Sequence, residues 1–310
     1  MNAKQFLQLL FALLCTLISC TAVAGPLIIE PEDGRAPILS AITHAKHSIY
    51  LAMYGFTDKI LFNALLWQKQ QGREVKILLE DQPYRFSNEN DKIITSLNAN
   101  HINWKSKAPH FYLIHQKTLI IDHTLAIVMS FNFTQSTFQR TRNFGLIIED
   151  PILVRDIEAV FLADWEHTTT PHHASSLIYS PEDSRAKLLA AIHQAKHTIE
   201  IYAQSISDYE MIRALTEAAH QGVAITLLTS SHIPAKKARP LKKAGIKIVY
   251  QRRLYIHAKA WIVDNETAII GSTNLTRSSL DANRELSVMT QDPAVIAALR
   301  GAFEDDSRSE

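Results

Sequence analysis

The chain has 310 residues, 46% of them hydrophobic, which is enough for one large or two medium domains with packed cores. This composition excludes an intrinsically disordered chain. The formal net charge is +1 at pH 7, so total charge indicates neither a strongly basic nucleic-acid binder nor an acidic solvating chain.

Residues 1–24 are predicted to be a secretory signal peptide. Lys4 gives a short positive start, residues 6–18 are mainly apolar, and Ala22-Val23-Ala24 ends the segment in small residues. An uncleaved membrane anchor is the alternative, but polar residues such as Gln8 interrupt an apolar run already near the lower limit for crossing ~30 Å of hydrocarbon. We therefore expect an exported protein, periplasmic or secreted.

Both cysteines, Cys15 and Cys20, lie in this segment. Cleavage after Ala24 would leave a mature chain without a thiol, which excludes a disulfide or a cysteine-bound metal. In an alternative interpretation, residues 17–20 (Leu-Ile-Ser-Cys) resemble a bacterial lipoprotein box, and Cys20 would become a lipidated N-terminus.

After this segment the sequence is an internal repeat. Residues 31–33 (Pro-Glu-Asp) recur at 181–183, and residues 45–47 (Ala-Lys-His) recur at 195–197, both 150 residues later (181 − 31). From His115 onward the matching residue lies 142 positions later, at His257 (257 − 115). The first repeat therefore has a surplus of eight residues (150 − 142) between Gly72 and His115, where we expect a surface loop.

Each repeat predicts the same order of elements after a short apolar run. These are an amphipathic helix (residues 35–47 and 185–197), a strand (49–54 and 199–203), a helix ending at Gln-Gly (71–72 and 221–222) and a further strand (75–79 and 223–228). Alternating strands and helices predict an α/β fold in which helices flank a mixed sheet. We assign repeat 1 to residues 25–166, a linker to 167–175 and repeat 2 to 176–310.

One motif occupies matching places in the two repeats. It reads His-x-Lys-x4-Asp and is followed by Ser-x-Asn: His115, Lys117, Asp122, Ser130 and Asn132, then His257, Lys259, Asp264, Ser272 and Asn274. Side chains two residues apart on a strand share a face, so each histidine points with its lysine and each serine with its asparagine. The aspartates belong to the catalytic motif, but they fall in hairpin turns, where a carboxylate can accept backbone N–H bonds, and this favours an architectural role.

The duplicated motif resembles that of the phospholipase D superfamily, and the resemblance covers nearly the whole chain after residue 24. It implies two homologous α/β repeats packed as a pseudo-two-fold phospholipase D fold, with both motifs at one cleft. The family includes phospholipases, phosphatidyl transferases, endonucleases and tyrosyl-DNA phosphodiesterases.

These residue types suit phosphodiester chemistry without a metal or cofactor. The substrate is anionic, and Lys117, Lys259, Asn132 and Asn274 can donate to its nonbridging oxygens. Two imidazoles can act as nucleophile and proton donor, with a covalent phosphohistidine intermediate that water or an alcohol then attacks. A zinc site is the alternative for a chain with 14 histidines, yet no His-x3-His helix pair with a glutamate occurs.

The second repeat matches the family pattern more fully than the first. Gly271 and Glu285 correspond to Met129 and Asn143 in the first repeat. In the family an acidic residue of the opposite half holds each histidine, which implies His115 with Glu285 and His257 with Asn143. Since a carboxylate stabilises the positive imidazole that forms on attack, we predict His115 as the nucleophile and His257, with a lower pKa, as the proton donor. Met129 is expected to crowd the turn that Gly271 leaves open.

A basic run precedes His257: residues 236–253 contain eight lysines and arginines and no acid. It is either a solvated helix face or a surface that steers lipid headgroups or nucleic acid. Aromatic residues at 111, 112 and 255 could line an apolar pocket, stack on bases or belong to the core. The predicted substrate-binding residues are Ser130, Asn143, Ser272, Arg252 and Arg253.

Export favours a phospholipase D-type hydrolase that cleaves phospholipid headgroups and contacts the membrane peripherally, because its substrate is available outside the cytoplasm. The alternatives are a nonspecific endonuclease, a phosphatidyl transferase of the cardiolipin synthase type, and an inactive binder of anionic surfaces. Intact histidines and lysines in both repeats argue against the last. An internal duplication makes a monomer sufficient.

Overall fold

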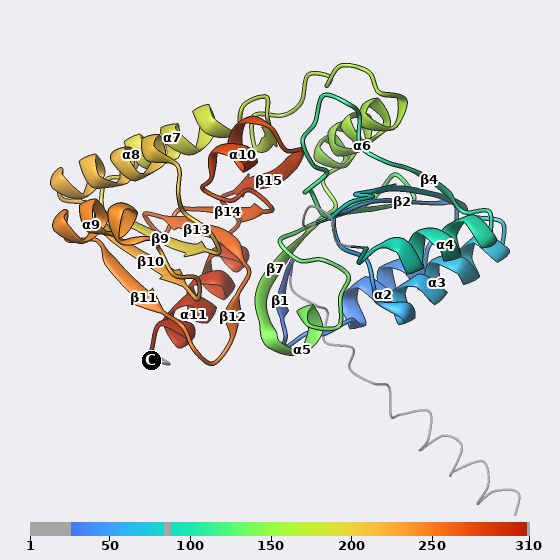
Figure 1. Cartoon of the computed structure of the whole chain (residues 1–310), viewed down its shortest axis with the longest axis horizontal. Coiled ribbons are helices and arrows are strands. Elements are labelled where there is room, and N and C mark those ends of the chain that lie inside the picture. The colour runs from blue at the N-terminus through green and yellow to red at the C-terminus, as the bar shows by residue number, and fades with distance from the viewer. Residues whose placement is uncertain (1–25, 84–87, 309–310) are drawn as a thin grey trace, which may run out of the picture.

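A computed structural model of the chain describes residues 26–83 and 88–308. The predicted signal peptide and both cysteines lie outside these residues. The described chain forms two similar halves that pack side by side (Figure 1). Within the described ranges, no helix has both the length and the apolar character needed to cross a membrane.

The first half contains β1 (Leu27–Glu30), α2 (Ala36–Thr43), β2 (Ser48–Met53), α3 (Lys59–Gln70), β3 (Glu74–Leu79), α4 (Asp91–Ala99), β4 (Asn103–Lys105), β5 (Thr118–Ile121), β6 (Leu125–Met129), α5 (Thr137–Arg140), β7 (Thr141–Ile148) and α6 (Pro151–Glu166). The predicted linker, residues 167–175, lies between α6 and the first strand of the second half.

The second half contains β8 (Leu177–Ser180), α7 (Ser184–Gln194), β9 (Thr198–Ala203), α8 (Tyr209–His220), β10 (Ala224–Thr229), α9 (Ala235–Lys243), β11 (Lys247–Tyr250), β12 (Tyr255–Ile256), β13 (Lys259–Val263), β14 (Thr267–Gly271), α10 (Arg277–Asp281), β15 (Glu285–Thr290) and α11 (Pro293–Arg308). Apart from the short β12, its elements follow the order of the first half.

Each half is built on one mixed sheet. The first sheet has the order β1-β7-β6-β5-β2-β3-β4, and β12 of the second half also pairs with β7. The second sheet has the order β11-β10-β9-β13-β14-β15-β8. In the first sheet β2, β3 and β4 are parallel, as are β9, β10 and β11 in the second, whereas the hairpins β5-β6 and β13-β14 are antiparallel. The predicted pseudo-two-fold α/β fold is therefore confirmed.

Three apolar clusters hold the layers together. One lies between the first sheet and helices α2, α3 and α4, and a second lies between the second sheet and helices α7, α8 and α9 (Figure 1). The third fills the space between the two sheets and includes residues of α6 and α11. The inner faces of both sheets thus share one core, which fixes the halves against each other.

An aspartate caps the N-terminus of the second helix in each half. Asp58 accepts from the backbone amides of Ile60 and Leu61 at the start of α3, and Asp208 does the same at the start of α8. Gly72 and Gly222 follow the helix ends with φ of 82° and 98°, a conformation that glycine adopts readily. The Gln-Gly helix stops predicted from sequence are confirmed.

The prediction that the first helix runs from residue 35 to 47 was too long, since α2 ends at Thr43. The amides of Lys46 and His47 donate instead to the Asp122 carboxylate, at 2.7 and 2.6 Å, and this holds the chain out of the helix. The eight surplus residues of the first repeat lie in two loops. The offset between the halves falls from 150 at β3 (224 − 74) to 144 at α4 (235 − 91), and then to 142 at His115.

Candidate active site

The two histidines are fixed where the halves meet. The backbone amide of His115 donates to the carbonyl of Arg284 at 2.8 Å, and that of His257 donates to the carbonyl of Arg142 at 3.1 Å. Arg284 and Arg142 immediately precede Glu285 and Asn143 in the chain. Each histidine is therefore anchored to the other half of the molecule beside its expected partner.

A buried carboxylate holds His115. Its Nδ1 lies 2.8 and 3.0 Å from the two oxygens of Glu285, which is fully buried. Ser279 Oγ and Asn283 Nδ2 also donate to Glu285, at 2.5 and 3.3 Å. An ionised carboxylate only accepts hydrogen bonds, so Nδ1 of His115 carries the proton and Nε2 keeps its lone pair.

An amide takes the corresponding place beside His257. Asn143 Oδ1 lies 2.8 Å from Nδ1 of His257, and its Nδ2 donates to Thr141 Oγ at 2.7 Å. Ser130 Oγ also donates to Asn143 Oδ1, at 3.0 Å. This orientation fixes the same tautomer as in the other half, with Nε2 unprotonated, but it adds no negative charge.

The lysines approach from beneath the histidines. Lys117 is fully buried, its ammonium donates to the carbonyl of His115, and it lies 5.3 Å from the ring centroid of Tyr54. Lys259 donates to the carbonyl of His257 at 2.5 Å. Burial lowers the pKa of Lys117 to about 7, against the opposing effect of Glu285. Burial and the charge of Lys117 lower the pKa of Lys259 well below its usual value.

Both imidazoles are held neutral in the free protein. Burial lowers the pKa of His115 to about 4 although Glu285 opposes the shift, and burial together with Lys259, Lys117 and His115 lowers the pKa of His257 well below its usual value. Burial is the largest cause of both shifts, and the lower pKa expected for His257 beside Asn143 stays a prediction. Because these groups act on one another's pKa, both motifs form one electrostatic unit. A bound anion would raise the pKa of each of them.

The two motif asparagines differ in their contacts. Asn132 Oδ1 accepts from the backbone amide of Gly55 at 3.1 Å, which directs its amide group away from the backbone. Asn274 Oδ1 is buried and has no hydrogen-bond partner in the described part of the chain. Both remain predicted donors to a phosphate.

The predicted substrate-binding serines are structural instead. Ser130 and Ser272 are fully buried. Ser130 Oγ accepts from the amide of Phe144 at 2.9 Å, and Ser272 Oγ accepts from the amide of Leu286 at 3.1 Å. Each serine therefore ties the strand of its motif to the strand that carries Asn143 or Glu285. Neither offers surface to a ligand, so this part of the prediction was wrong.

Asp122 and Asp264 hold turns rather than substrate. Each is in the left-handed region, with φ of 52° and 53°, and lies at the far end of its strand from the motif lysine. Asp264 accepts from the amides of Lys196, His197 and Thr198 at 2.7–2.8 Å, as Asp122 does in the first half. These contacts fit the architectural role expected for both aspartates rather than a catalytic one.

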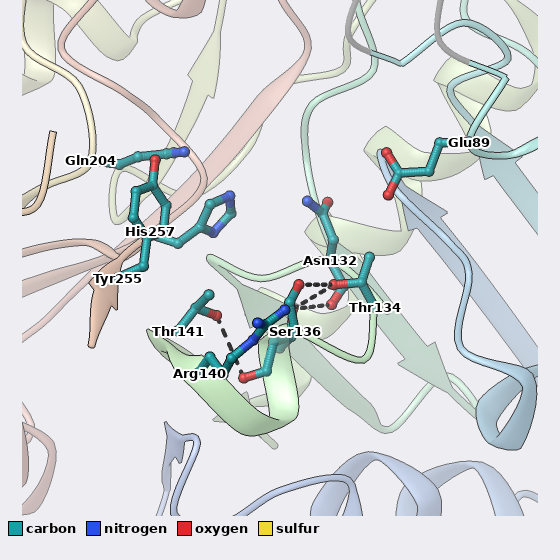
Figure 2. Close-up of a pocket in the computed structure, with 10 residues that line it drawn as sticks. Glu89, Asn132, Thr134, Ser136, Arg140, Thr141, Gln204, Tyr255 and His257 are labelled. Carbon is teal, nitrogen blue, oxygen red and sulfur yellow. Dashed lines mark hydrogen bonds between the residues drawn. The ribbon is translucent and has the colours of Figure 1, made fainter. Parts of the chain in front are cut away.

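A cavity of about 500 Å³ adjoins His257. Figure 2 shows its walls, which come from both halves. They are formed by Glu89, Asn132, Thr134, Ser136, Thr137, Arg140, Thr141, Gln204, Tyr255 and His257. Of the three aromatic residues considered from sequence, Tyr255 lines this cavity, whereas Phe111 is buried against the Arg284 guanidinium.

The arginines predicted to bind substrate lie elsewhere. Arg253 is 3.6 Å from Asp306 and lines a separate cavity with Glu32 and residues of α11. Arg252 is exposed, and neither arginine lines the cavity beside His257. Both arginines lie in the segment between β11 and β12, and Arg253 points toward Asp306 of α11.

Two buried arginine clusters were missed in the sequence. Arg142 pairs with Glu32 and with Asp306 (2.6 Å), and Arg284 pairs with Glu182 (2.8 Å) and with Asp164 (2.5 Å). In each cluster one acid comes from the opposite half, so both clusters clamp the interface directly behind Asn143 and Glu285. The repeat offsets were the available signal, because all three members recur at 142 or 150 residues.

Met129 does not crowd its surroundings. It is fully buried in β6 and pairs with Gly145 of β7, and a Cβ at Gly145 would come 3.4 Å from Met129. In the second half the glycine is on the other strand. Gly271 pairs with Ser287, and a Cβ at Gly271 would come 2.3 Å from Ser287 Cα. Each half therefore has one glycine and one larger residue at this strand pair, with the glycine on β7 in the first half and on β14 in the second.

Comparison with known proteins identifies relatives that match most of the chain. The family model described as "Cardiolipin synthase, PLD-like domain" matches residues 38–165 and 188–307. Cardiolipin synthase 2 of Staphylococcus epidermidis is 23% identical over 324 residues, covering 87% of this chain and 65% of that protein. Cardiolipin synthase 1 of the same species is 28% identical over 330 residues, covering 87% and 64%. The chain thus spans less than two thirds of these relatives.

Solved structures share the fold at low identity. A polyphosphate kinase from Porphyromonas gingivalis has a TM-score of 0.73 and 18% identity, covering 91% of this chain and 50% of that one. A phosphatidylserine synthase from Haemophilus influenzae has a TM-score of 0.71 and 10% identity, covering 92% and 87%. At these identities the likeness supports the fold alone.

Proposed function

The chain belongs to the phospholipase D superfamily of enzymes acting on phosphodiester bonds, and from this premise we propose that it is a phosphatidyl transferase that moves a phosphatidyl group from one alcohol to another. The sequence favoured hydrolysis of a headgroup over transfer. The curated relatives are named synthases, which favours transfer. The proposal rests mainly on one observation: His115 and His257 are held through Nδ1 by opposite halves, so both Nε2 atoms are available.

In the first step proposed, Nε2 of His115 attacks the phosphorus of the donor lipid. The P–N bond forms, the P–O bond to the leaving alcohol breaks, and His257 gives its Nε2 proton to the leaving oxygen. Glu285 favours His115 for this role, because a carboxylate stabilises the positive ring that results. The negative charge of the bound donor raises the pKa of His257, which is low in the free protein, so that its Nε2 takes up a proton from solvent before the attack.

In the second step an acceptor alcohol attacks the phosphohistidine. Its hydroxyl proton passes to Nε2 of His257, the P–N bond breaks and a new P–O bond forms. Water in the acceptor's place gives phosphatidic acid instead. Lys117, Lys259, Asn132 and Asn274 are the proposed donors to the nonbridging oxygens in both steps, since an ammonium or amide in a dry site stabilises phosphoryl charge strongly.

The proposal is tested with purified protein and vesicles of phosphatidylglycerol, with a chelator present. Transfer gives cardiolipin and glycerol, whereas hydrolysis gives phosphatidic acid and glycerol, and thin-layer separation distinguishes the lipids. We expect cardiolipin, its loss in His115→Ala, and no change in His220→Ala, an exposed histidine on α8. Phosphatidic acid as sole product would favour the hydrolase. Cleavage of single-stranded DNA without lipid turnover would favour the endonuclease. Export through residues 1–24 stays a proposal, which cell fractionation tests.

A further inference from the structure

The two halves differ in the space beside their histidines. The ring of Tyr54 packs edge-on against His115, with 4.8 Å between the centroids. The equivalent residue of the second half is Gln204 (204 − 54 = 150), which has no ring and lines the 500 Å³ cavity beside His257. The replacement of an aromatic ring by an amide therefore accompanies an open space on the His257 side.

The polar wall of this cavity comes from the loop after β6, helix α5 and the first residue of β7. It supplies hydroxyl groups and one guanidinium, from Thr134, Ser136, Thr137, Thr141 and Arg140 (Figure 2). Arg140 is exposed, and its guanidinium has no ion pair or hydrogen bond with any residue of the described ranges. The equivalent residue in the second half is Ala282 (282 − 140 = 142). The guanidinium of Arg140 therefore has no counterpart at the equivalent position of the second half.

We propose that this cavity holds the alcohol that leaves in the first step and the alcohol that enters in the second, and that Arg140 recognises a phosphate group carried by the entering alcohol. The inference rests on the proposed transfer reaction. In an in-line displacement the leaving and entering oxygens lie opposite the nucleophile, so with His115 attacking they lie toward His257. Whatever is attached to those oxygens then occupies the cavity beside His257.

The chemistry of the wall defines the class of acceptor. A guanidinium binds a phosphate through two parallel N–H bonds, and the neighbouring hydroxyls suit a polyol. The carboxylate of Glu89 stands on the opposite wall, apart from Arg140 (Figure 2). An acceptor with a phosphate at one end and free hydroxyls at the other, such as a glycerol phosphate ester, therefore matches the wall better than a neutral alcohol does.

Soluble acceptors test this without a second lipid. Labelled glycerol and labelled glycerol 3-phosphate are each offered with vesicles of phosphatidylglycerol in phosphatidylcholine, and label entering the lipid is measured. The wild type should use glycerol 3-phosphate more efficiently. Arg140→Ala should lower the ratio of the two efficiencies ~10- to 100-fold, the range expected for one charged hydrogen-bonding partner, and Arg140→Lys should fall between. Arg213→Ala, which alters an exposed arginine on α8 outside the cavity, is the matched control.

An unchanged ratio in Arg140→Ala, or an equal loss with both acceptors, would overturn the assignment of Arg140. Failure of the proposed function looks different. The wild type would then put label from neither acceptor into lipid, whatever stands at position 140, and the inference would fall with it.

Discussion

Glu30 is the carboxyl group whose burial gives the clearest expectation. It is the last residue of β1, is fully buried, and lies directly opposite Asn143 in the sheet. Neither of its carboxylate oxygens has a hydrogen-bond partner among the described residues. In the second half the equivalent residue is Ser180, which donates to Ser184 at 2.6 Å. We predict that Glu30→Gln changes how stability depends on pH.

The magnitude follows from the pKa. Burial, and then the charge of Asp33, raise the pKa of Glu30 from 4.5 to about 8. Below pH 4.5 the group is protonated in both the folded and the unfolded chain and costs nothing. Between pH 4.5 and 8 the folded chain keeps a proton that the unfolded chain has lost, so stability falls as pH rises, by at most ~1.4 kcal/mol per pH unit. Over this window the upper limit is about 5 kcal/mol.

The assay is urea unfolding of the wild type and Glu30→Gln at pH 5, 6, 7 and 8. The variant removes the titrating group and keeps its volume, so the difference in unfolding free energy should move in favour of the variant as pH rises. Glu266→Gln, which changes an exposed glutamate in a hairpin turn, should run parallel to the wild type. Parallel curves for Glu30→Gln as well would refute the view that Glu30 is protonated in the folded chain at neutral pH.

Three further predictions concern the site and its support. When the reaction with an activated phosphodiester is quenched and the protein is mapped by peptide analysis, the acid-labile, base-stable phosphohistidine should be found on His115 and should accumulate in His257→Ala. Phosphoryl label on His257 would reverse the assignment of the nucleophile. The value of kcat/KM should fall as pH rises through about 7, where Lys117 loses its proton in the free enzyme, and a flat profile from pH 6 to 8 would contradict this. Arg284→Met should lower the unfolding free energy by about 3–5 kcal/mol, because it leaves Asp164 and a second carboxylate without their cation, and a loss under about 1 kcal/mol would show that the cluster contributes little.

The fold and the pairing of the histidines could be predicted because both rest on repetition. A duplicated chain must place matching residues at matching points of two similar halves, so the offsets of 150 and 142 located the elements and the motifs together. The contact of His115 with Glu285 was implied by the family resemblance, and the structure contains it. Strand periodicity was also used to place each lysine on the face of its histidine, but His115 and His257 lie just before β5 and β13 rather than on them.

The errors in the predicted site arose where the role of a residue depends on how deeply it is buried or on which surface its side chain faces. Spacing put Ser130 on the face of Asn132, but it could not say that the serine lies deep enough to be covered by β7. Proximity in sequence suggested that Arg253 would reach the substrate of His257, but a turn between two strands can send neighbours to different surfaces. The burial of Arg142 could be predicted only from the recurrence of its charged partners in both repeats, because a single arginine in a strand does not indicate burial.

The two halves differ in the carboxyl groups that they place near the histidines. Where Glu285 stands beside His115, the first half has Asn143 beside His257, and a carboxyl appears at Glu30 on the adjacent strand, opposite that asparagine. Burial raises the pKa of Glu30 to about 8, so this group carries no charge at pH 7. The His257 side therefore has no negative charge in contact with its imidazole, and a proton can leave that ring readily once the anionic phosphate moves away. The His115 side keeps its carboxylate, which is what a ring that becomes positive on attack requires. From this we infer that Glu285 beside His115, with Asn143 as its counterpart beside His257, divides nucleophilic attack and proton transfer between the two halves.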